Sequence, residues 1–182
     1  MKIREIVLSA IMVLGAASAH GLVVDGADEI DIYASESFVS AYDSSIITTH
    51  VGSSVAFLDG YDSSTFNING GEISWLELYD SNVTNISFVE DLSWLLVSDN
   101  STVNIFGSDF SYSRGHLSGT WGNGSSFSFW ALEELDLHGG NIGDFLPDNI
   151  ILHVVSVPEP SSLALFFLGV AGLVFRRNKV RV

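Results

Sequence analysis

The chain contains no cysteine, which excludes a disulfide scaffold, a thiolate metal site and a thiol nucleophile. Basic residues are also scarce: between residues 20 and 157 the only one is Arg114, against 20 of the 22 acidic residues of the chain. A surface of this sign repels phosphate backbones and anionic lipids, so we expect no nucleic-acid partner. The length of 182 residues allows one modest domain with processing segments at its ends.

Residues 1–19 have the three parts of a secretory signal peptide. The first residues are positively charged, residues 6–14 are apolar, and Ala17 and Ala19 place small side chains just before a cleavage point at His20. An ordinary amphipathic first helix is the alternative interpretation. We predict a signal peptide that passes through the translocon and is removed by signal peptidase.

Residues 157–182 form a second processing segment with the opposite polarity. An uncharged stretch at 163–175 is long enough for a short transmembrane helix. Arg176 and Arg177 follow it directly, and the positive-inside rule keeps such a cluster on the cytoplasmic side. A buried core helix is the alternative for the apolar stretch.

This tail resembles the PEP-CTERM sorting domain of exported bacterial proteins. Pro158, Glu159 and Pro160 correspond to the Pro-Glu-Pro motif, and the apolar stretch and the two arginines correspond to the helix and the basic end that follow it. The resemblance implies cleavage near the motif by an exosortase, a membrane-embedded transpeptidase-like enzyme. It also implies a transient stay in the inner membrane, delivery to the cell surface, outer membrane or extracellular matrix, and a bacterium that makes extracellular polysaccharide. It implies nothing about the body, because the family attaches this signal to unrelated domains.

The body repeats with a nearly constant period of about 19 residues. Four aspartates begin successive units at this spacing; they are Asp43, Asp62, Asp80 and Asp99. In the last three units an asparagine and an isoleucine follow each aspartate at the same distance; these pairs are Asn67-Ile68, Asn85-Ile86 and Asn104-Ile105. Each unit holds two short β-prone runs between Gly, Ser, Asp and Asn residues.

Two strands in so short a unit leave no room for a helix and predict one coil of a parallel β-helix, with coils stacked ~4.8 Å apart. We expect the isoleucines to stack inside and the asparagines to bond one another from coil to coil on the other face or at a bend. The predicted fold is therefore all-β, a short parallel β-solenoid flanked by a signal helix and a C-terminal transmembrane helix. A β-sandwich is the alternative.

The repeats also predict how the body is organised. Residues 20–41 are expected to form a degenerate first coil, residues 42–115 the regular coils and residues 116–156 a β cap. Within the cap, Gly122-Asn123-Gly124 predicts a hairpin turn, and 150–155 is the expected last strand. A different terminal unit is needed because an open last coil would expose apolar core and unpaired strand edges.

The aspartate row is the only candidate metal site that the sequence offers, and a weak one. Asp43, Asp62, Asp80 and Asp99, stacked at coil spacing, could be bridged by Ca²⁺. The favoured interpretation is structural, because Asp starts turns by bonding nearby backbone amides and the glycine-aspartate repeat of calcium-binding solenoids is missing. We therefore expect no cofactor.

Four aromatic residues recur with the repeat and form the other candidate site. Trp75, Trp94, Tyr61 and Tyr79 could make a stripe on which sugars stack. Packing in the core or in a ladder is the favoured interpretation for aromatic residues at repeat spacing.

The predicted function is that of a non-enzymatic exported surface or matrix protein, structural or adhesive, associated with extracellular polysaccharide and processed by an exosortase. One alternative is a polysaccharide lyase or hydrolase on a β-helical platform, which needs two carboxylates facing each other across a cleft. Another is a calcium-dependent binding module. No catalytic residue is assigned, because the histidines lack metal-binding spacing and no G-x-S-x-G or phosphate-loop motif occurs.

Overall fold

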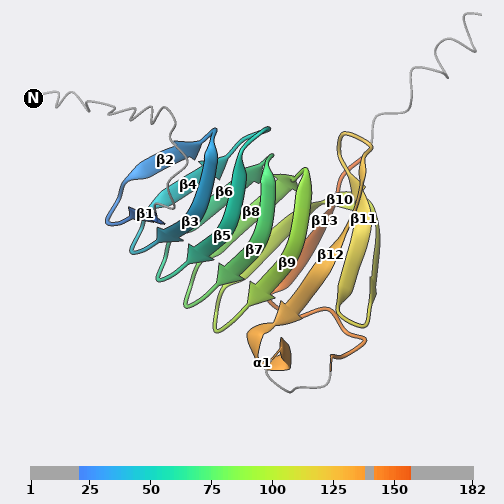
Figure 1. Cartoon of the computed structure of the whole chain (residues 1–182). Helices are drawn as coiled ribbons and strands as arrows, with labels where there is room; N and C mark the ends of the chain where they lie inside the picture. The colour runs from blue at the N-terminus through green and yellow to red at the C-terminus, as the bar shows by residue number, and fades with distance from the viewer. Residues whose placement is uncertain (1–20, 138–141, 157–182) are drawn as a thin grey trace, which may run out of the picture.

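The computed structural model describes residues 21–137 and 142–156. The described chain winds as a β-solenoid whose coils follow one another along one axis, from blue to orange in Figure 1. Its elements are β1 (Gly21–Val24), β2 (Glu29–Ile32), β3 (Ser35–Ala41), β4 (Ile46–Thr49), β5 (Ser54–Gly60), β6 (Thr65–Asn69), β7 (Glu72–Leu78), β8 (Val83–Phe88), β9 (Asp91–Val97), β10 (Thr102–Ser113), β11 (His116–Trp121), β12 (Ser126–Glu133), α1 (Glu134–Leu137) and β13 (Ile150–Val154).

Two parallel sheets form the walls of the solenoid. Strands β1, β3, β5, β7 and β9 pair in parallel on one wall, and β2, β4, β6, β8 and β10 pair in parallel on the other. The register joins Ser35 to Ser54, Ser54 to Glu72 and Glu72 to Asp91, so each coil has the length that the spacing of the aspartates indicated. The predicted all-β parallel β-helix with two strands per coil is confirmed.

The core between the walls is built from ladders of apolar side chains. Ile68, Ile86 and Ile105 occupy equivalent positions on β6, β8 and β10 and are fully buried, as the repeat predicted. The facing wall contributes a buried leucine ladder, which consists of Leu58, Leu76 and Leu95. Burying one such side chain is worth ~1.5–3 kcal/mol relative to exposing it, so these ladders supply much of the driving force for folding.

An asparagine ladder runs along the outer side of the even-numbered wall. Asn85 Nδ2 donates to Asn67 Oδ1 at 3.1 Å, and Asn104 Nδ2 donates to Asn85 Oδ1 at 3.0 Å. His153 on β13 continues the row, with Nε2 2.9 Å from Asn104 Oδ1. The predicted coil-to-coil bonding of the amides is confirmed.

A hairpin of β11 and β12 closes the C-terminal end of the solenoid. Strand β11 pairs antiparallel with β10 and β12, and β12 pairs parallel with β9, so the hairpin joins the two walls (Figure 1). Its turn lies where it was predicted, with the Gly124 amide donating to the Trp121 carbonyl at 2.9 Å. Leu117, Trp121 and Phe129 of the hairpin are buried. Strand β13 pairs in parallel with β10, at the position expected for the last strand.

The N-terminal end is an open sheet edge made by β1 and β2. Both strands are only four residues long. Asp25, Asp28 and Asp31 lie on or beside them. Short edges with charged side chains resist pairing with other chains, so these two strands are poor templates for it.

The predicted processing residues lie outside the described part of the chain; they are Ala17, Ala19, Pro158, Glu159, Pro160, Arg176 and Arg177. The same holds for the predicted transmembrane helix at 163–175. Within residues 21–137 and 142–156, no helix has the length and apolar character that a membrane crossing requires.

Candidate functional site

The four aspartates proposed from the repeat do form a row along one edge of the solenoid. Each lies in the left-handed region, with φ between 52° and 56°, which Asp tolerates better than most residues. The Asp43 amide donates to Asp62 Oδ2 at 3.1 Å, the Asp62 amide to Asp80 Oδ2 at 3.1 Å, and the Asp80 amide to Asp99 Oδ2 at 3.2 Å. Each accepting carboxylate therefore holds the turn of the preceding coil.

The geometry of this row gives it a structural role. Across the described residues, no group of three or more His, Asp or Glu side chains is arranged to hold a metal ion. A hydrogen bond with Asp25 and repulsion by its charge raise the pKa of Asp43, as expected for carboxyl groups stacked side by side. The hydrogen bonds of the row thus serve the turns.

A row of tyrosine rings lies beside the aspartates. Tyr42, Tyr61 and Tyr79 stack with ring centroids 4.9 Å and 5.0 Å apart. The Tyr79 hydroxyl donates to Glu77 Oε2 at 2.8 Å. Burial, together with this hydrogen bond, raises the pKa of Tyr79, so the hydroxyl remains a donor to the carboxylate at neutral pH.

A longer row of rings, called here the aromatic row, runs along the outside of the odd-numbered wall. Its members occupy equivalent positions on β3, β5, β7, β9 and β12; they are Phe38, Phe57, Trp75, Trp94 and Trp130. Ring centroids are 4.9 Å apart for Phe38–Phe57, 6.3 Å for Phe57–Trp75, 5.1 Å for Trp75–Trp94 and 5.3 Å for Trp94–Trp130. The rings therefore form one continuous stack.

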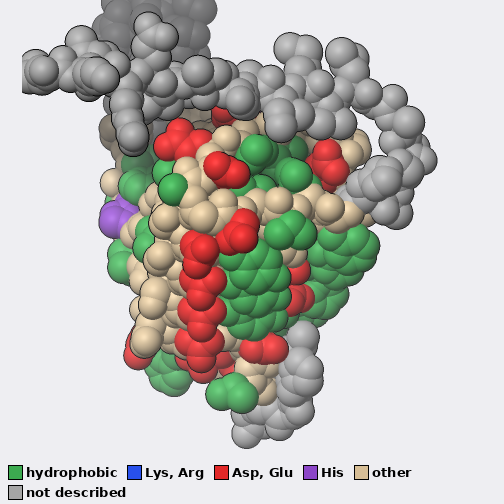
Figure 2. Space-filling model, turned by 90° about the vertical axis from the view of Figure 1, so that its left-hand side faces the viewer, with side chains coloured by type: hydrophobic (Ala, Val, Ile, Leu, Met, Phe, Trp, Pro, Cys, Tyr) green, Lys and Arg blue, Asp and Glu red, His purple; other side chains and the backbone are tan. Residues whose placement is uncertain are grey.

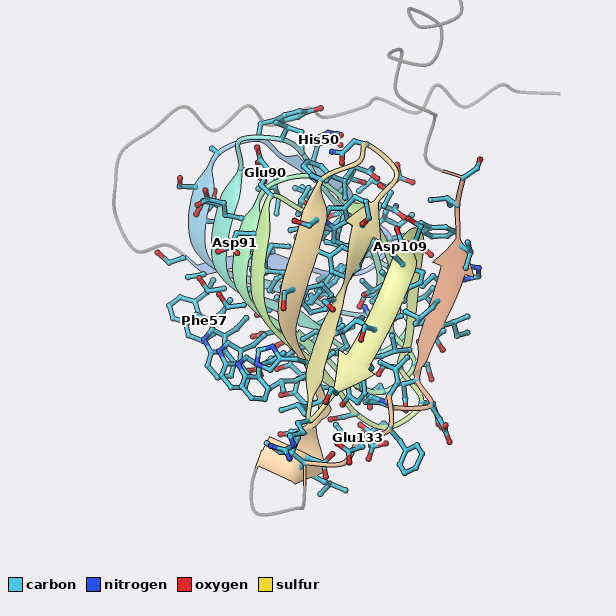
Figure 3. All side chains as sticks on the ribbon, turned by 90° about the vertical axis from the view of Figure 1, so that its right-hand side faces the viewer. His50, Phe57, Glu90, Asp91, Asp109 and Glu133 are labelled. Carbon is cyan, nitrogen blue, oxygen red and sulfur yellow. The ribbon has the colours of Figure 1, made fainter. Side chains whose placement is uncertain are left out.

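The aromatic row faces solvent. The residue after each ring is buried in the core, and successive side chains of a strand point to opposite faces; these buried residues are Val39, Leu58, Leu76, Leu95 and Ala131. In Figure 3, Phe57 projects from the outer side of the wall with further rings stacked beside it. Trp75 and Trp94 therefore pack in a ladder, which is one of the two arrangements of the favoured interpretation, and this ladder lies on the outer side of the wall. The tyrosines belong to the other row, so the single stripe of four aromatic residues does not exist.

Stacking leaves the edges of the rings as the accessible part of the row, because each ring face covers the next. The indole N–H groups of Trp75, Trp94 and Trp130 have no hydrogen-bond partner among the described residues, and none is fully buried. They recur once per coil, at a strand spacing of ~4.8 Å. The row thus presents three free donors in a line along the solenoid axis.

Two carboxyl groups flank the aromatic row on the same wall. Asp59 and Glu77 are register partners on β5 and β7, two positions beyond Phe57 and Trp75. Asp59 Oδ1 is the only buried side-chain nitrogen or oxygen of the described residues that has no hydrogen-bond partner. Burial, with repulsion from Glu77, raises the pKa of Asp59 to about 6. Oδ1 is closed to a ligand, so Oδ2 is the oxygen of this carboxyl group that a ligand on the outer face could contact.

Sequence reasoning missed three members of the aromatic row, which are Phe38, Phe57 and Trp130. Phe38, Phe57 and Trp75 follow one another at the same period that revealed the aspartates. That spacing could have found the two phenylalanines. Trp130 lies within the hairpin cap, on β12, where the fixed period of the coils no longer holds.

The carboxyl group of Asp59 should make the free energy of unfolding fall as pH rises, which is opposite to the effect of a carboxyl group whose pKa is lowered by folding. Its pKa is raised from 3.8 to about 6 by folding, so its stabilising contribution is present below about pH 4 and is lost as pH rises through about 6. We expect Asp59→Asn to raise the free energy of unfolding by about 1 kcal/mol at about pH 8, after allowance for solvent screening, and to change it little at about pH 4. Urea unfolding of both proteins at the two pH values measures this. An equal difference at both values would contradict the raised pKa.

A hollow of about 420 Å³ lies at the C-terminal end of the odd-numbered wall. It is lined by Val97, Ser98, Asp99, Glu133, Glu134, Leu135 and Asn149. The Ser98 hydroxyl donates to Glu134 Oε2 at 2.9 Å, and Asp99 Oδ2 accepts the Asp80 amide at 3.2 Å. Two of the three acids that line the hollow are therefore engaged in hydrogen bonds within the fold.

Comparison with known proteins assigns the tail. A family model described as the PEP-CTERM protein-sorting motif matches residues 156–178, which include the Pro-Glu-Pro sequence, the apolar stretch and both arginines. No curated protein and no solved structure matches the chain significantly. The chain is thus a β-solenoid body that carries a PEP-CTERM sorting motif.

The motif defines the class of the protein. It marks an exported protein that transits the membrane and is processed by an exosortase, which is therefore its processing partner. The matched segment lies outside the solenoid, so the role of the body has to come from the solenoid surface.

Proposed function

We propose that the chain is a non-enzymatic matrix or cell-surface protein that holds extracellular polysaccharide along the aromatic row. In this account the signal peptide at 1–19 directs export, the exosortase processes the tail, and the solenoid acts outside the cell as a structural or adhesive module. The observation that carries the proposal is the line of free indole N–H groups of Trp75, Trp94 and Trp130 on the outer wall.

The spacing of the tryptophan rings suits a linear polymer. The ring centroids of Trp75 and Trp94 are 5.1 Å apart and those of Trp94 and Trp130 are 5.3 Å apart, which is close to the length of one hexose unit in an extended chain. A polysaccharide lying parallel to the solenoid axis would meet one donor per sugar. Sugar hydroxyl and ring oxygens would accept these hydrogen bonds, and the apolar ring edges would contact the C–H groups of the sugars.

Rigidity supports the same function. The rings are fixed by stacking and by the register of β7, β9 and β12, so little side-chain freedom is lost when a ligand binds. Aromatic side chains that are already ordered are favourable binding elements for this reason.

The experiment removes the indole N–H donors and keeps the stacked aromatic rings. In Trp75→Phe with Trp94→Phe the rings remain, because Phe38 and Phe57 already stack in this row at 4.9 Å. We expect retardation of the full chain, in mild detergent, on gels containing polysaccharide from the producing bacterium to weaken about tenfold, since two hydrogen bonds are lost.

Trp121→Phe is the matched control. Trp121 is buried in the cap, with 1% of its surface exposed, and its replacement should leave retardation unchanged. Retardation of the double variant equal to that of the unmodified chain would rule out the aromatic row as the binding surface.

A second candidate function is polysaccharide cleavage in the hollow at the cap. The observation in its favour is that carboxyl groups from Asp99, Glu133 and Glu134 line one concave site. Release of new reducing ends from the polysaccharide by the purified chain, lost in Glu133→Gln, would favour cleavage over binding.

A further inference from the structure

The charge of the body restricts which polysaccharides can approach the aromatic row. Arg114 is the only Lys or Arg among the described residues. The same residues include all 20 acidic residues that lie between residues 20 and 157. The face drawn in Figure 2 shows acidic side chains in a column beside a broad hydrophobic patch, and no side chain in the colour of Lys and Arg is visible on it. A polymer of uronic acids would be repelled by this field, whereas a polycation would be attracted.

Two carboxyl groups next to the aromatic row add a local preference for cationic ligands. Asp59 and Glu77 lie side by side on β5 and β7, on the face that carries Phe57 and Trp75. The Tyr79 hydroxyl holds Glu77 Oε2 at 2.8 Å, which fixes the orientation of that carboxylate. Asp59 Oδ1 is buried without a partner, so nothing in the described part of the protein offsets the cost of ionising this carboxyl group, and Oδ2 is the oxygen that a bound ammonium group would contact.

Building on the proposed function, we infer that the polysaccharide held along the aromatic row is a chain of free amino sugars, whose ammonium groups bind Asp59 and Glu77. The indole N–H groups of Trp75 and Trp94 then donate to oxygens of the same chain. Donors on the protein meet acceptors on the sugar, and acceptors on the protein meet the ammonium donors.

The physical basis is complementarity in both charge and hydrogen bonding. An ammonium group is a three-fold donor without acceptor capacity, and its hydrogen bonds to carboxylates are about twice as strong as neutral ones. A cation at this position also relieves the repulsion between Asp59 and Glu77 and stabilises the ionised form of Asp59. An N-acetylated sugar keeps the hydroxyl groups but loses this charge.

The test compares three oligosaccharides of equal length by isothermal titration calorimetry with the full chain in mild detergent, at about pH 6, where most sugar amines are protonated. They are a β-1,4-linked glucosamine oligomer, its N-acetylated counterpart and a uronic acid oligomer. We expect the glucosamine oligomer to bind about tenfold more tightly than the N-acetylated one, as one charge-assisted hydrogen bond would give. Asp59→Asn with Glu77→Gln should remove this preference and leave the affinity for the N-acetylated oligomer unchanged.

Asp62→Asn with Asp80→Asn is the control, because it removes the same charge from the aspartate row at the turns. If this control abolishes the preference equally, the preference comes from the overall field and the inferred site is wrong. Equal affinity of the unmodified chain for the two glucosamine oligomers would overturn the inference and leave the proposed function standing. Binding of none of the three oligosaccharides would also overturn the inference, and the gel experiment with the polysaccharide from the producing bacterium would then decide the proposed function by itself.

Discussion

Ile86→Ala is expected to lower the free energy of unfolding by about 3–4 kcal/mol, because it opens a cavity in the middle of the isoleucine ladder. Ile86 is fully buried and has register partners on both sides, Ile68 on β6 and Ile105 on β10. The neighbouring coils cannot move in to fill the space, since the backbone ladder and the asparagine side chains hold them at a fixed spacing. Urea or thermal unfolding of the unmodified and variant proteins measures the loss.

Ile151→Ala is the matched control for this prediction. Ile151 is also in a strand, β13, but 45% of its surface is exposed, so its truncation should cost less than about 1 kcal/mol. Ile86→Val, which removes one methylene group, should fall between the two at about 1 kcal/mol. Equal losses for Ile86→Ala and Ile151→Ala would contradict a core built from stacked ladders.

Replacing Pro158, Glu159 and Pro160 together by alanine is expected to abolish processing of the tail almost completely. These residues lie in the matched sorting motif, and the two prolines also prevent a helix from extending back towards the body. An immunoblot against the solenoid should show the unprocessed chain accumulating in the inner-membrane fraction, with little in the surface or matrix fraction. The effect should leave the fold of the body unchanged, because the motif lies outside the solenoid strands.

Ser161→Ala with Ser162→Ala provides the control beside the motif. It changes two adjacent residues of the matched segment and leaves Pro-Glu-Pro intact, so processing should continue. A triple alanine variant that still reached the surface in processed form would show that the exosortase recognises some other part of the tail.

The repeat made the interior and the turns of this fold predictable. Each repeat is just long enough for two strands and two turns, so equivalent positions of successive repeats must stack. That reasoning located the isoleucine and asparagine ladders, with Asn85 bonded to both Asn67 and Asn104. The same reasoning placed the aspartates in one row. It did not reveal that each carboxylate accepts a hydrogen bond from an amide of the preceding coil, because a single turn considered alone does not show this contact.

The candidate binding surface was harder to predict, because it depends on which face of a strand each ring occupies. Strict alternation would place Ile73 and Trp75 on one face of the strand and Leu76 and Leu78 on the other. Both faces then carry apolar residues, so alternation gives no clear orientation for Trp75. The pairing of Asp59 with Glu77 was hidden for another reason. The two residues differ in type, and their contact depends on the register between β5 and β7 and on the degree of burial at Asp59.

The division of the chain into two working parts explains its unusual charge distribution. Six of the seven Lys and Arg residues lie at the two ends, one of which carries the sorting motif, and the body carries 20 of the 22 acidic residues. The acidic charge of the described solenoid opposes the pairing of its terminal strands β1 and β2 with other chains. The same charge favours neutral or cationic polymers at the aromatic row over acidic ones.

The most direct test of the proposed binding surface is the nuclear magnetic resonance spectrum of the indole N–H groups. The chain has four tryptophans, three in the aromatic row and Trp121 in the cap, so four signals are expected. Addition of the polysaccharide from the producing bacterium should shift the signals of Trp75, Trp94 and Trp130 and leave that of the buried Trp121 in place. Polysaccharide that binds the protein without moving these three signals would contradict the account.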